Sequence, residues 1–272
     1  MTYEIDNKYN TSVLVKDRDI DAYIDSDDEI PREIIQAMGK TCRENYLQYL
    51  YPVLYHKEFY MRSDAAQSIF NINGSMGLQE LKKREAMLDE ADLKREPSEK
   101  AMLKAMIFRI EKGPEEVKRF FLSDDGYEIV KFDTPFCYRS GYRFQEEDID
   151  ILCFVLEQSQ RKTTKWLRGL SKSDYDELIY FTLDSICIAG EETDIFKKID
   201  SLLSERIYAA VRLLLEQRIN NDCKELIAEL PRYMEWEQAK GILRLLRNNV
   251  KGYARGVYKK TLKLMKIEES EL

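Results

Sequence analysis

Apolar side chains recur at positions i, i+3, i+4 and i+7 along most of the chain, and this spacing constrains the fold more than any other feature. On an α-helix such residues form one stripe that faces a core. The pattern therefore predicts an all-α protein. The clearest sets are Leu103, Met106, Ile107 and Ile110; Ile179, Thr182, Leu183 and Ile186; Ile207, Ala210, Val211 and Leu214; and Ala239, Ile242, Leu243 and Leu246.

The stripes recur at similar intervals. Starts at Ala66, Leu103, Leu152, Ile179, Ile207 and Ala239 give successive spacings of 37, 49, 27, 28 and 32 residues. Such intervals are typical of helical-hairpin repeats, in which each helix pair buries its stripe against its neighbours. We expect the second helices of these pairs at 77–88, 115–122, 194–203 and 222–230, with turns at Gly113-Pro114 and Asn220-Asn221.

One interval is longer because residues 125–144 interrupt the helical period with a nearly alternating, aromatic-rich pattern. This insertion is predicted to be a β-hairpin or an ordered loop. Tyr and Arg often anchor interfaces, because they bury a large rigid area and keep polar donors. A cap packed over the helices is the alternative. The candidate partner-binding residues of the insertion are Tyr127, Phe136, Tyr138, Arg139, Tyr142 and Arg143.

The segment 61–81 combines a basic residue, the paired alanines Ala65 and Ala66, the polar turn Asn73-Gly74 and a second, leucine-bearing helix. In this it resembles a HEAT-type helical repeat. The other units share only the helix spacing, and they lack the regular turn aspartate and second-helix arginine of that family. The resemblance implies a curved α-solenoid over about residues 60–266 that is used mainly to bind proteins. An irregular helical bundle is the alternative.

Charge is distributed unevenly along the chain. Residues 1–33 contain ten acidic and four basic residues, whereas residues 239–266 contain nine basic residues and no acidic one. We predict an acidic N-terminal segment over residues 1–45 and a helical-repeat domain over residues 46–272, which includes a basic C-terminal helix at about 250–266.

On that last helix, residues spaced by four would form a cationic ridge, with a largely apolar stripe on a separate face. Like charges at this spacing repel one another unless an anion offsets them, so the ridge is a candidate site for an anionic partner. Neutralisation by acidic helices of the same chain is the alternative. The ridge is Lys251, Arg255, Lys259 and Lys263, and the stripe is Val250, Ala254, Val257, Thr261 and Leu264.

Five aspartates fit the spacing of a calcium-binding EF-hand loop at its positions 1, 3, 5, 9 and 12: Asp17, Asp19, Asp21, Asp25 and Asp28. However, Ala22 stands at the sixth position, where the turn needs glycine, and the last position is not the bidentate glutamate. The alternation of Ile20, Ala22 and Ile24 also fits a short strand, and a solvated acidic tail is a further alternative. We predict no metal site.

Catalytic motifs are missing from the sequence. His56 is the only histidine, and no phosphate-binding, dinucleotide-binding, zincin or hydrolase motif occurs. The cysteines form no C-x-x-C pair and mostly lie in apolar stretches, so they are predicted to be buried thiols. We expect a protein that is not an enzyme and needs no cofactor. The cysteines are Cys42, Cys137, Cys153, Cys187 and Cys223.

The predicted function is a binding scaffold, adaptor or inhibitor that captures a protein partner on a solenoid surface. The alternative is a nucleic-acid-binding protein resembling the HEAT-fold DNA glycosylases, with the ridge on phosphates and Trp166 or Trp236 near a base. The net charge of −7 counts against that alternative. Without an apolar leader or a membrane-length apolar run, we expect a cytoplasmic protein that does not insert into membranes.

Overall fold

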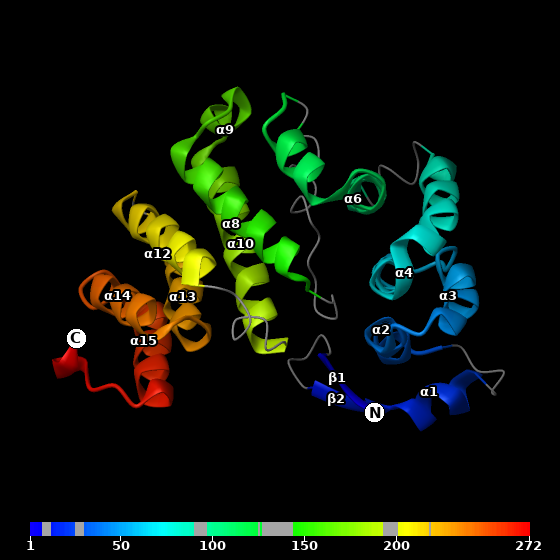
Figure 1. Cartoon of the computed structure of the whole chain (residues 1–272), viewed down its shortest axis with the longest axis horizontal. Coiled ribbons are helices and arrows are strands. Elements are labelled where there is room, and N and C mark those ends of the chain that lie inside the picture. Colours follow the sequence, from blue (N-terminus) through cyan, green and yellow to red (C-terminus); the bar gives the residue numbers. More distant parts are fainter. Residues whose placement is uncertain are drawn as a thin grey trace. The chain divides into compact units, whose positions relative to one another are not determined.

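The computed structural model describes residues 1–6, 12–24, 30–89, 97–124, 126, 144–192, 201–217 and 219–272. In this part of the chain every element is a helix except for one two-stranded hairpin (Figure 1). The prediction of an all-α protein is confirmed at this level. The chain divides into two compact units. Unit 1 consists of Met1–Val117 with Glu128–Arg143, and unit 2 consists of Lys118–Tyr127 with Phe144–Leu272.

Unit 1 begins with an antiparallel hairpin in which Tyr3 pairs with Val15. Helices follow, and both α2 and α3 pack on the long helix α4. The elements are β1 (Thr2–Asp6), β2 (Ser12–Lys16), α1 (Asp17–Ile24), α2 (Arg32–Thr41), the 3-10 helix η1 (Glu44–Tyr46), α3 (Leu47–Val53), α4 (Phe59–Met87) and the greater part of α6 (Pro97–Phe121).

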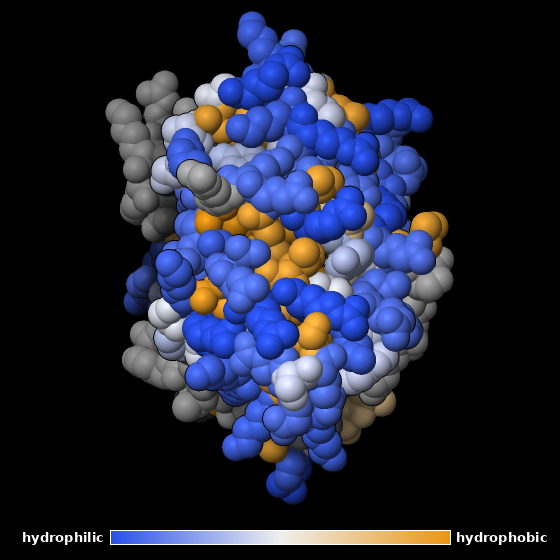
Figure 2. Space-filling view, turned by 90° about the vertical axis from the view of Figure 1, so that its left-hand side faces the viewer, coloured by the Kyte–Doolittle hydropathy of each residue, from blue (hydrophilic) through white to orange (hydrophobic). Residues whose placement is uncertain are grey.

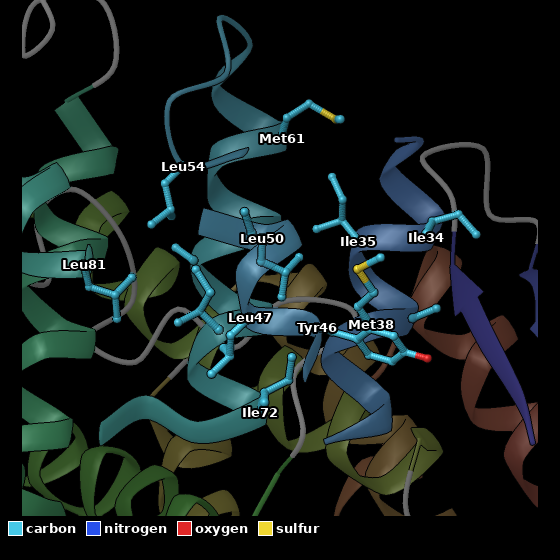
Figure 3. Packing of buried hydrophobic residues seen from close by; sticks show 14 of the residues in the cluster. Ile34, Ile35, Met38, Tyr46, Leu47, Leu50, Leu54, Met61, Ile72 and Leu81 are labelled. Carbon is cyan, nitrogen blue, oxygen red and sulfur yellow. The ribbon is translucent and has the colours of Figure 1, made fainter. Parts of the chain in front are cut away.

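A single hydrophobic cluster joins the hairpin and α1 to the helices of unit 1. Tyr3, Ile5, Val15 and Ile20 belong to it. Figure 3 shows buried residues that α2, α3 and α4 contribute to the same cluster. The boundary near residue 45 stays a prediction, but the acidic segment buries its own apolar residues in the same core as the helices that follow. Charge composition did not reveal this burial, since it counts the acidic residues of the segment and not the apolar residues that lie between them.

Two long helices are interrupted where the sequence predicted turns. In α4, Asn73 has non-helical angles (φ −166°, ψ 93°), and its side-chain oxygen accepts a hydrogen bond from the backbone N–H of Met76 at 3.2 Å. In α6, Gly113 has φ 78° and directly precedes Pro114. A positive φ is easily adopted only by glycine, and proline favours the first turn of a new helix.

Unit 2 contains the last turns of α6 and then α8 (Glu146–Arg161), α9 (Lys165–Gly169), α10 (Lys172–Glu192), α12 (Ser201–Glu216), α13 (Asn221–Glu229), the 3-10 helix η2 (Leu230–Tyr233), α14 (Trp236–Leu246), α15 (Gly252–Met265) and the 3-10 helix η3 (Glu269–Glu271). Its helices pack in two rows. In one row α8 contacts α12, and α12 contacts α14; in the other α10 contacts α13, and α13 contacts α15.

The predicted stripes supply the core of unit 2. All four residues of the sets that begin at Ile179, Ile207 and Ala239 are buried. In unit 1, Leu103 and Met106 are buried, while Ile107 and Ile110 are half-buried. The expected helix at 194–203 lies mostly outside the described residues, as does the insertion at 125–144. No described helix is long and apolar enough to cross a membrane.

Candidate functional site: the exposed face of the last helix

Helix α15 is the best-defined of the predicted binding elements. It begins after Lys251, whose extended backbone (φ −137°, ψ 166°) serves as the N-cap, and it ends at Met265 before Lys266 in the left-handed region. Gly252, the first helical residue, has φ 58°. The predicted basic helix at 250–266 is therefore present, with both of its ends set by local backbone geometry.

The buried face of α15 differs in part from the predicted stripe. Ala254, Val257 and Thr261 are buried as expected, but Leu264 is 59% exposed. Tyr258 and Leu262 are buried in its place. The reason is that α15 packs on both α13 and η2, so that its contact face is wider than one stripe. Thr261 accepts a hydrogen bond from Nε of Arg232, in η2, at 3.1 Å.

The exposed face of α15 carries lysines beside an aromatic side chain. Lys259, Lys260 and Lys263 are exposed, and the side chain of Tyr253 is 77% exposed. Among the described residues, no ion pair reaches these three lysines. Gly256 lies between Tyr253 and the lysines, and a Cβ placed there would meet no atom within 4 Å. We call Tyr253, Lys259, Lys260 and Lys263 the cationic face.

The four residues of the predicted ridge have different surroundings, and their role in partner binding stays a prediction. Arg255 turns to the chain itself, because it donates to Glu269 at 2.7 Å and to the carbonyl oxygen of Arg247 at 2.9 Å. Lys251 is exposed but lies at the N-cap rather than within the helix. Lys260 is also exposed on this helix. It was not among the predicted residues, because the ridge contained only residues spaced by four.

Helix α14 adds charge and an aromatic side chain to the same unit. Trp236 is 47% exposed, and the ammonium of Lys240 lies 5.2 Å from the centre of its ring, a cation–π contact. Arg244 is exposed. Figure 2 shows the side of the molecule on which α12 and α14 lie; hydrophilic residues cover most of it, and apolar residues gather near its centre.

Trp166, the other tryptophan, is a packing residue. Its indole N–H donates to the carbonyl oxygen of Phe121 at 3.2 Å, and its ring meets that of Phe121 edge-on at 5.1 Å. The expectation that Trp166 lies near a bound base is therefore not supported by its surroundings, whereas Trp236 keeps an exposed surface.

The candidate residues of the insertion, Tyr127, Phe136, Tyr138, Arg139, Tyr142 and Arg143, lie outside the described residues. Their role in partner binding stays a prediction.

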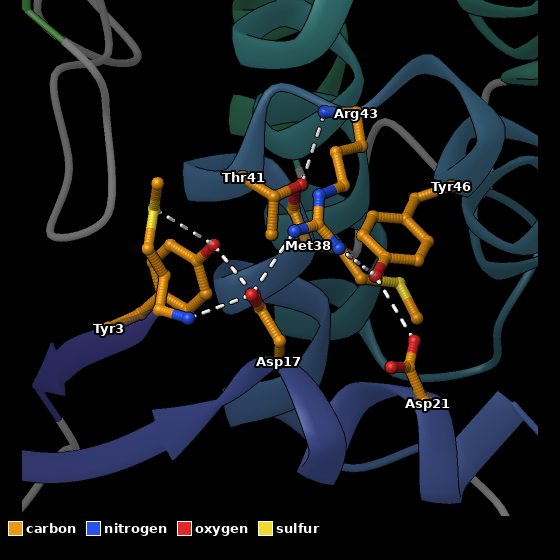
Figure 4. A network of polar contacts seen from close by, with 8 residues as sticks. Tyr3, Asp17, Asp21, Met38, Thr41, Arg43 and Tyr46 are labelled. Carbon is orange, nitrogen blue, oxygen red and sulfur yellow. Dashed lines mark hydrogen bonds and ion pairs between the residues drawn. The ribbon is translucent and has the colours of Figure 1, made fainter.

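The aspartates of the EF-hand-like pattern are arranged differently from a calcium loop. Residues 17–24 form α1, so this stretch is neither an EF-hand-like loop nor the alternative short strand. Asp17 instead accepts hydrogen bonds from the amino group of Met1 and from Tyr3, both at 2.8 Å, and from Arg43 at 3.1 Å (Figure 4). Asp25 and Asp28 lie outside the described residues.

This polar network ties the hairpin to α1 and η1. Arg43 also donates to the hydroxyl of Tyr46 at 3.3 Å. Burial, and then the hydrogen bond to Asp17, raise the pKa of Tyr3 to about 12. The hydrogen bonds from the amino group and from Tyr3 hold the pKa of Asp17 below its usual value. The carboxylate of Asp17 thus stabilises the fold. Among the described residues, no group of three or more His, Cys, Asp or Glu side chains is placed so that it could hold a metal ion.

The described cysteine thiols are buried or half-buried, and the imidazole of His56 forms a local hydrogen bond. Burial raises the pKa of Cys153 and of Cys223 to about 12 and that of Cys187 well above its usual value, so thiolates are scarce at neutral pH. Cys42 is half-buried, and Cys137 lies outside the described residues. Nδ1 of His56 accepts a hydrogen bond from the backbone N–H of Glu58 at 3.1 Å.

Unit 2 also has an acidic region, on α10 and α13. Burial raises the pKa of Asp184, and the nearby carboxylates of Glu229 and Glu191 raise it further. Tyr233 donates to Glu191 at 2.9 Å. Acidic α10–α13 and basic α14–α15 thus give unit 2 two differently charged surfaces.

Comparisons of the chain with protein-family models, with curated proteins and with solved structures found no match.

Proposed function

We propose that this protein is a non-enzymatic binding scaffold that captures a macromolecular partner through the cationic face of α15. The observation that carries the proposal is the exposure of Lys259, Lys260 and Lys263 without an ion pair among the described residues, next to the 77% exposed Tyr253. Unpaired cations repel one another on one helix face, and a bound anion removes that cost. An exposed tyrosine supplies the rigid area that interface anchors need.

The packing of unit 2 supports the further proposal of a HEAT-like α-solenoid built from helical hairpins. Among the successive helix pairs, α8 and α10 contact each other directly, and the later helices pack mainly along the two rows, α12 with α14 and α13 with α15. Stacked hairpins present extended surfaces, and such surfaces suit capture of a macromolecule better than of a small substrate. A short acidic protein segment is the partner class that we favour, because it can contact the cationic face alone, whereas a long polyanion such as duplex DNA also approaches the rest of a chain whose net charge is −7.

The test is affinity capture from the protein's own cells at low salt with a charge-reversed variant, Lys259→Glu with Lys260→Glu and Lys263→Glu. We expect the partner recovered with the wild-type chain to be lost, and the loss to shrink at high salt, where screening already removes the attraction. The matched control reverses three exposed cations elsewhere, Lys104, Lys165 and Arg212. Equal recovery with both variants would contradict the proposal.

A nucleic acid is the second candidate partner, and the exposed aromatic side chains favour it. Tyr253 and Trp236 both lie among cations, an arrangement that can stack bases while lysines contact phosphates. If three lysines neutralise phosphates of duplex DNA, the logarithm of affinity should fall against the logarithm of salt with a slope of roughly −3. Treatment of the lysate with nuclease separates this candidate from an acidic protein.

A further inference from the structure

The chain reverses direction directly after α15. Lys266 has left-handed angles (φ 56°, ψ 43°), and its N–H is directed at the carbonyl oxygens of Leu262 and Lys263. The N–H of Ile267 bonds the carbonyl oxygen of Leu262 at 3.0 Å. These bonds end the helix as a Schellman-type reversal does. The segment Ile267–Glu271, which we call the acidic tail, is thereby turned back toward the start of α15.

The acidic tail makes two anchoring contacts. Ile267 is only 5% exposed, so its side chain is seated against the protein. Two residues later, one carboxylate oxygen of Glu269 lies 2.7 Å from Arg255 and 4.0 Å from Arg247. The guanidinium of Arg255 lies 4.8 Å from the centre of the ring of Tyr258, which fixes its position. A single carboxylate is thus held between cations from α15 and from the turn after α14.

The other carboxylates of the tail do not share this arrangement. Glu268 and Glu271 are exposed, and no ion pair reaches either of them among the described residues. Only an apolar residue and a carboxylate two positions later are recognised. A docking site for a peptide needs such selective contacts. The buried apolar residue fixes the register of the segment, and the arginines bind the carboxylate two positions later.

We propose that the acidic tail is an internal ligand, and that the site formed by Arg247, Arg255 and the seat of Ile267 docks an acidic segment of a partner protein with the same pattern, an apolar residue followed two positions later by Asp or Glu. This inference rests on the proposed function, because it names a partner class for a second site on α15, beside the cationic face. The side chains of Arg255 and Glu269 are 30% and 32% exposed. An ion pair so exposed adds little stability, so the buried side chain of Ile267 supplies most of the hold on the tail, and a competing segment has to replace that apolar contact as well as the carboxylate.

The tail occupies its site at an effectively high local concentration, so it lowers the apparent affinity for any competing segment. Emptying the site should therefore strengthen binding. The open variant is Ile267→Ser with Glu269→Gln in the full chain. Its control is Glu268→Gln, which makes the same change in net charge but touches neither anchor.

The probe is a fluorescently labelled synthetic peptide with the sequence of residues 267–271, followed by fluorescence anisotropy. We expect the open variant to bind this peptide at least about tenfold more tightly than the wild type and Glu268→Gln do. Adding Arg255→Gln to the open variant should abolish the gain. Glu269→Gln alone, which keeps the Ile267 anchor, should show a smaller gain and serves if the open variant fails to fold.

Three results would overturn the inference. Equal affinity of the open variant and Glu268→Gln would show that the tail does not cover the site, and a gain that survives Arg255→Gln would be an effect of net charge. A larger gain for a single-stranded oligonucleotide of equal charge would assign the site to nucleic acid. None of these results removes the proposed function, which fails only if reversal of Lys259, Lys260 and Lys263 leaves partner capture unchanged.

Discussion

Glu99 lies only 1% exposed in unit 1 between two guanidinium groups. It accepts hydrogen bonds from Arg62 at 2.5 Å and 3.0 Å and from Arg84 at 2.8 Å. Arg62 also donates to the carbonyl oxygens of His56 and Lys57, both at 2.8 Å. Burial alone would raise the pKa of Glu99, but the bonds from the two arginines outweigh it and hold the pKa below 4.5.

Replacing Glu99 with Gln should lower the free energy of unfolding by about 3–5 kcal/mol, because two buried guanidinium groups lose the charge that they face. Urea denaturation of the full chain measures this. The control is Glu111→Gln, which removes the exposed ion pair of Glu111 with Lys82 between the same two helices and should leave the midpoint nearly unchanged. Similar costs for both variants would show that burial does not set the strength of the Glu99 contacts.

The same carboxylate predicts a dependence on pH. Since the pKa of Glu99 is lowered in the folded state, the unfolded chain binds the proton more tightly. The stability that Glu99 contributes is then complete above about pH 4.5 and is lost as the pH falls through the folded-state pKa. Urea midpoints measured from pH 7 to pH 3 should fall for the wild type and fall less steeply for Glu99→Gln.

Asp184 should behave in the opposite way. Its pKa is raised above 3.8 by burial and by Glu229 and Glu191, so its ionised form costs stability at neutral pH. Asp184→Asn should raise the free energy of unfolding at pH 7 by about 0.5–1 kcal/mol. This advantage should shrink as the pH falls through the folded-state pKa of Asp184, because the folded wild type then takes up the proton. An advantage that does not change with pH would rule out ionisation as its cause.

Single residues such as Glu99 could not be singled out from the sequence. Fifty acidic and forty-three basic residues make many pairs possible, and spacing alone marks only those within one helix. Arg62 and Glu99 are 37 residues apart and come from different helices. The buried thiols were predictable, because Cys153 and Cys187 lie inside apolar runs whose burial follows from the helical stripe.

At the scale of elements, α2 and α4 approach each other closely at Gly39. A Cβ on Gly39 would lie 2.6 Å from Oγ and 2.8 Å from Cα of Ser68, and that hydroxyl donates to the carbonyl oxygen of Ile35 at 2.9 Å. The absence of a side chain at Gly39 is thus what lets these two helices pack.

Gly39→Ala should destabilise the protein by about 1–2 kcal/mol, because overpacking outweighs the gain in helix propensity. The matched variant is Gly256→Ala in α15, where an added Cβ meets no neighbour and should stabilise by about 0.5–1 kcal/mol. Thermal unfolding of both variants provides the measurement. If Gly39→Ala were also stabilising, the two helices would have to separate without cost at this crossing.

Helix existence was easier to predict than the width of a buried face. The stripe beginning at Ile179 is buried as expected, because its three apolar residues and Thr182 share one face of the helix. In α15, by contrast, Leu264 was predicted to be buried and is exposed, while Tyr258 is buried and was not in the predicted stripe. The contacts with α13 and η2 that bury Tyr258 cannot be predicted from the sequence of one helix. The hairpin β1–β2 was missed because its strands lie within a segment dominated by acidic residues.

For the whole molecule, net charge and local charge predict different behaviour. With a net charge of −7 the chain should pass through a cation exchanger at pH 7. The cationic face instead predicts retention at about 0.1 M ionic strength, because screening then limits each charge to a range of about 10 Å, so that the resin responds to the local lysines more than to the net charge. Reversal of Lys259, Lys260 and Lys263 to Glu should abolish retention on a sulfonate resin, whereas reversal of Lys104, Lys165 and Arg212 should only reduce it.

The division of the molecule into units was the least predictable feature. Composition changes near residue 45, but the core of unit 1 continues across that point through residues such as Ile35 and Leu50. A boundary depends on which apolar faces meet, and this is a property of tertiary contacts. The basic helix and its exposure were anticipated, whereas the pairing of Arg255 with Glu269 required the chain reversal at Lys266.

Both tryptophans of the chain, Trp166 and Trp236, belong to unit 2. Intrinsic indole emission therefore reports on unit 2 directly, whereas far-ultraviolet circular dichroism reads the helices of both units. If the two units unfold together, the denaturation curves from the two methods should coincide; a mismatch would show that one unit unfolds while the other is still folded. An acrylamide quenching experiment should further divide the emission, since Trp236 is 47% exposed while Trp166 is packed against Phe121.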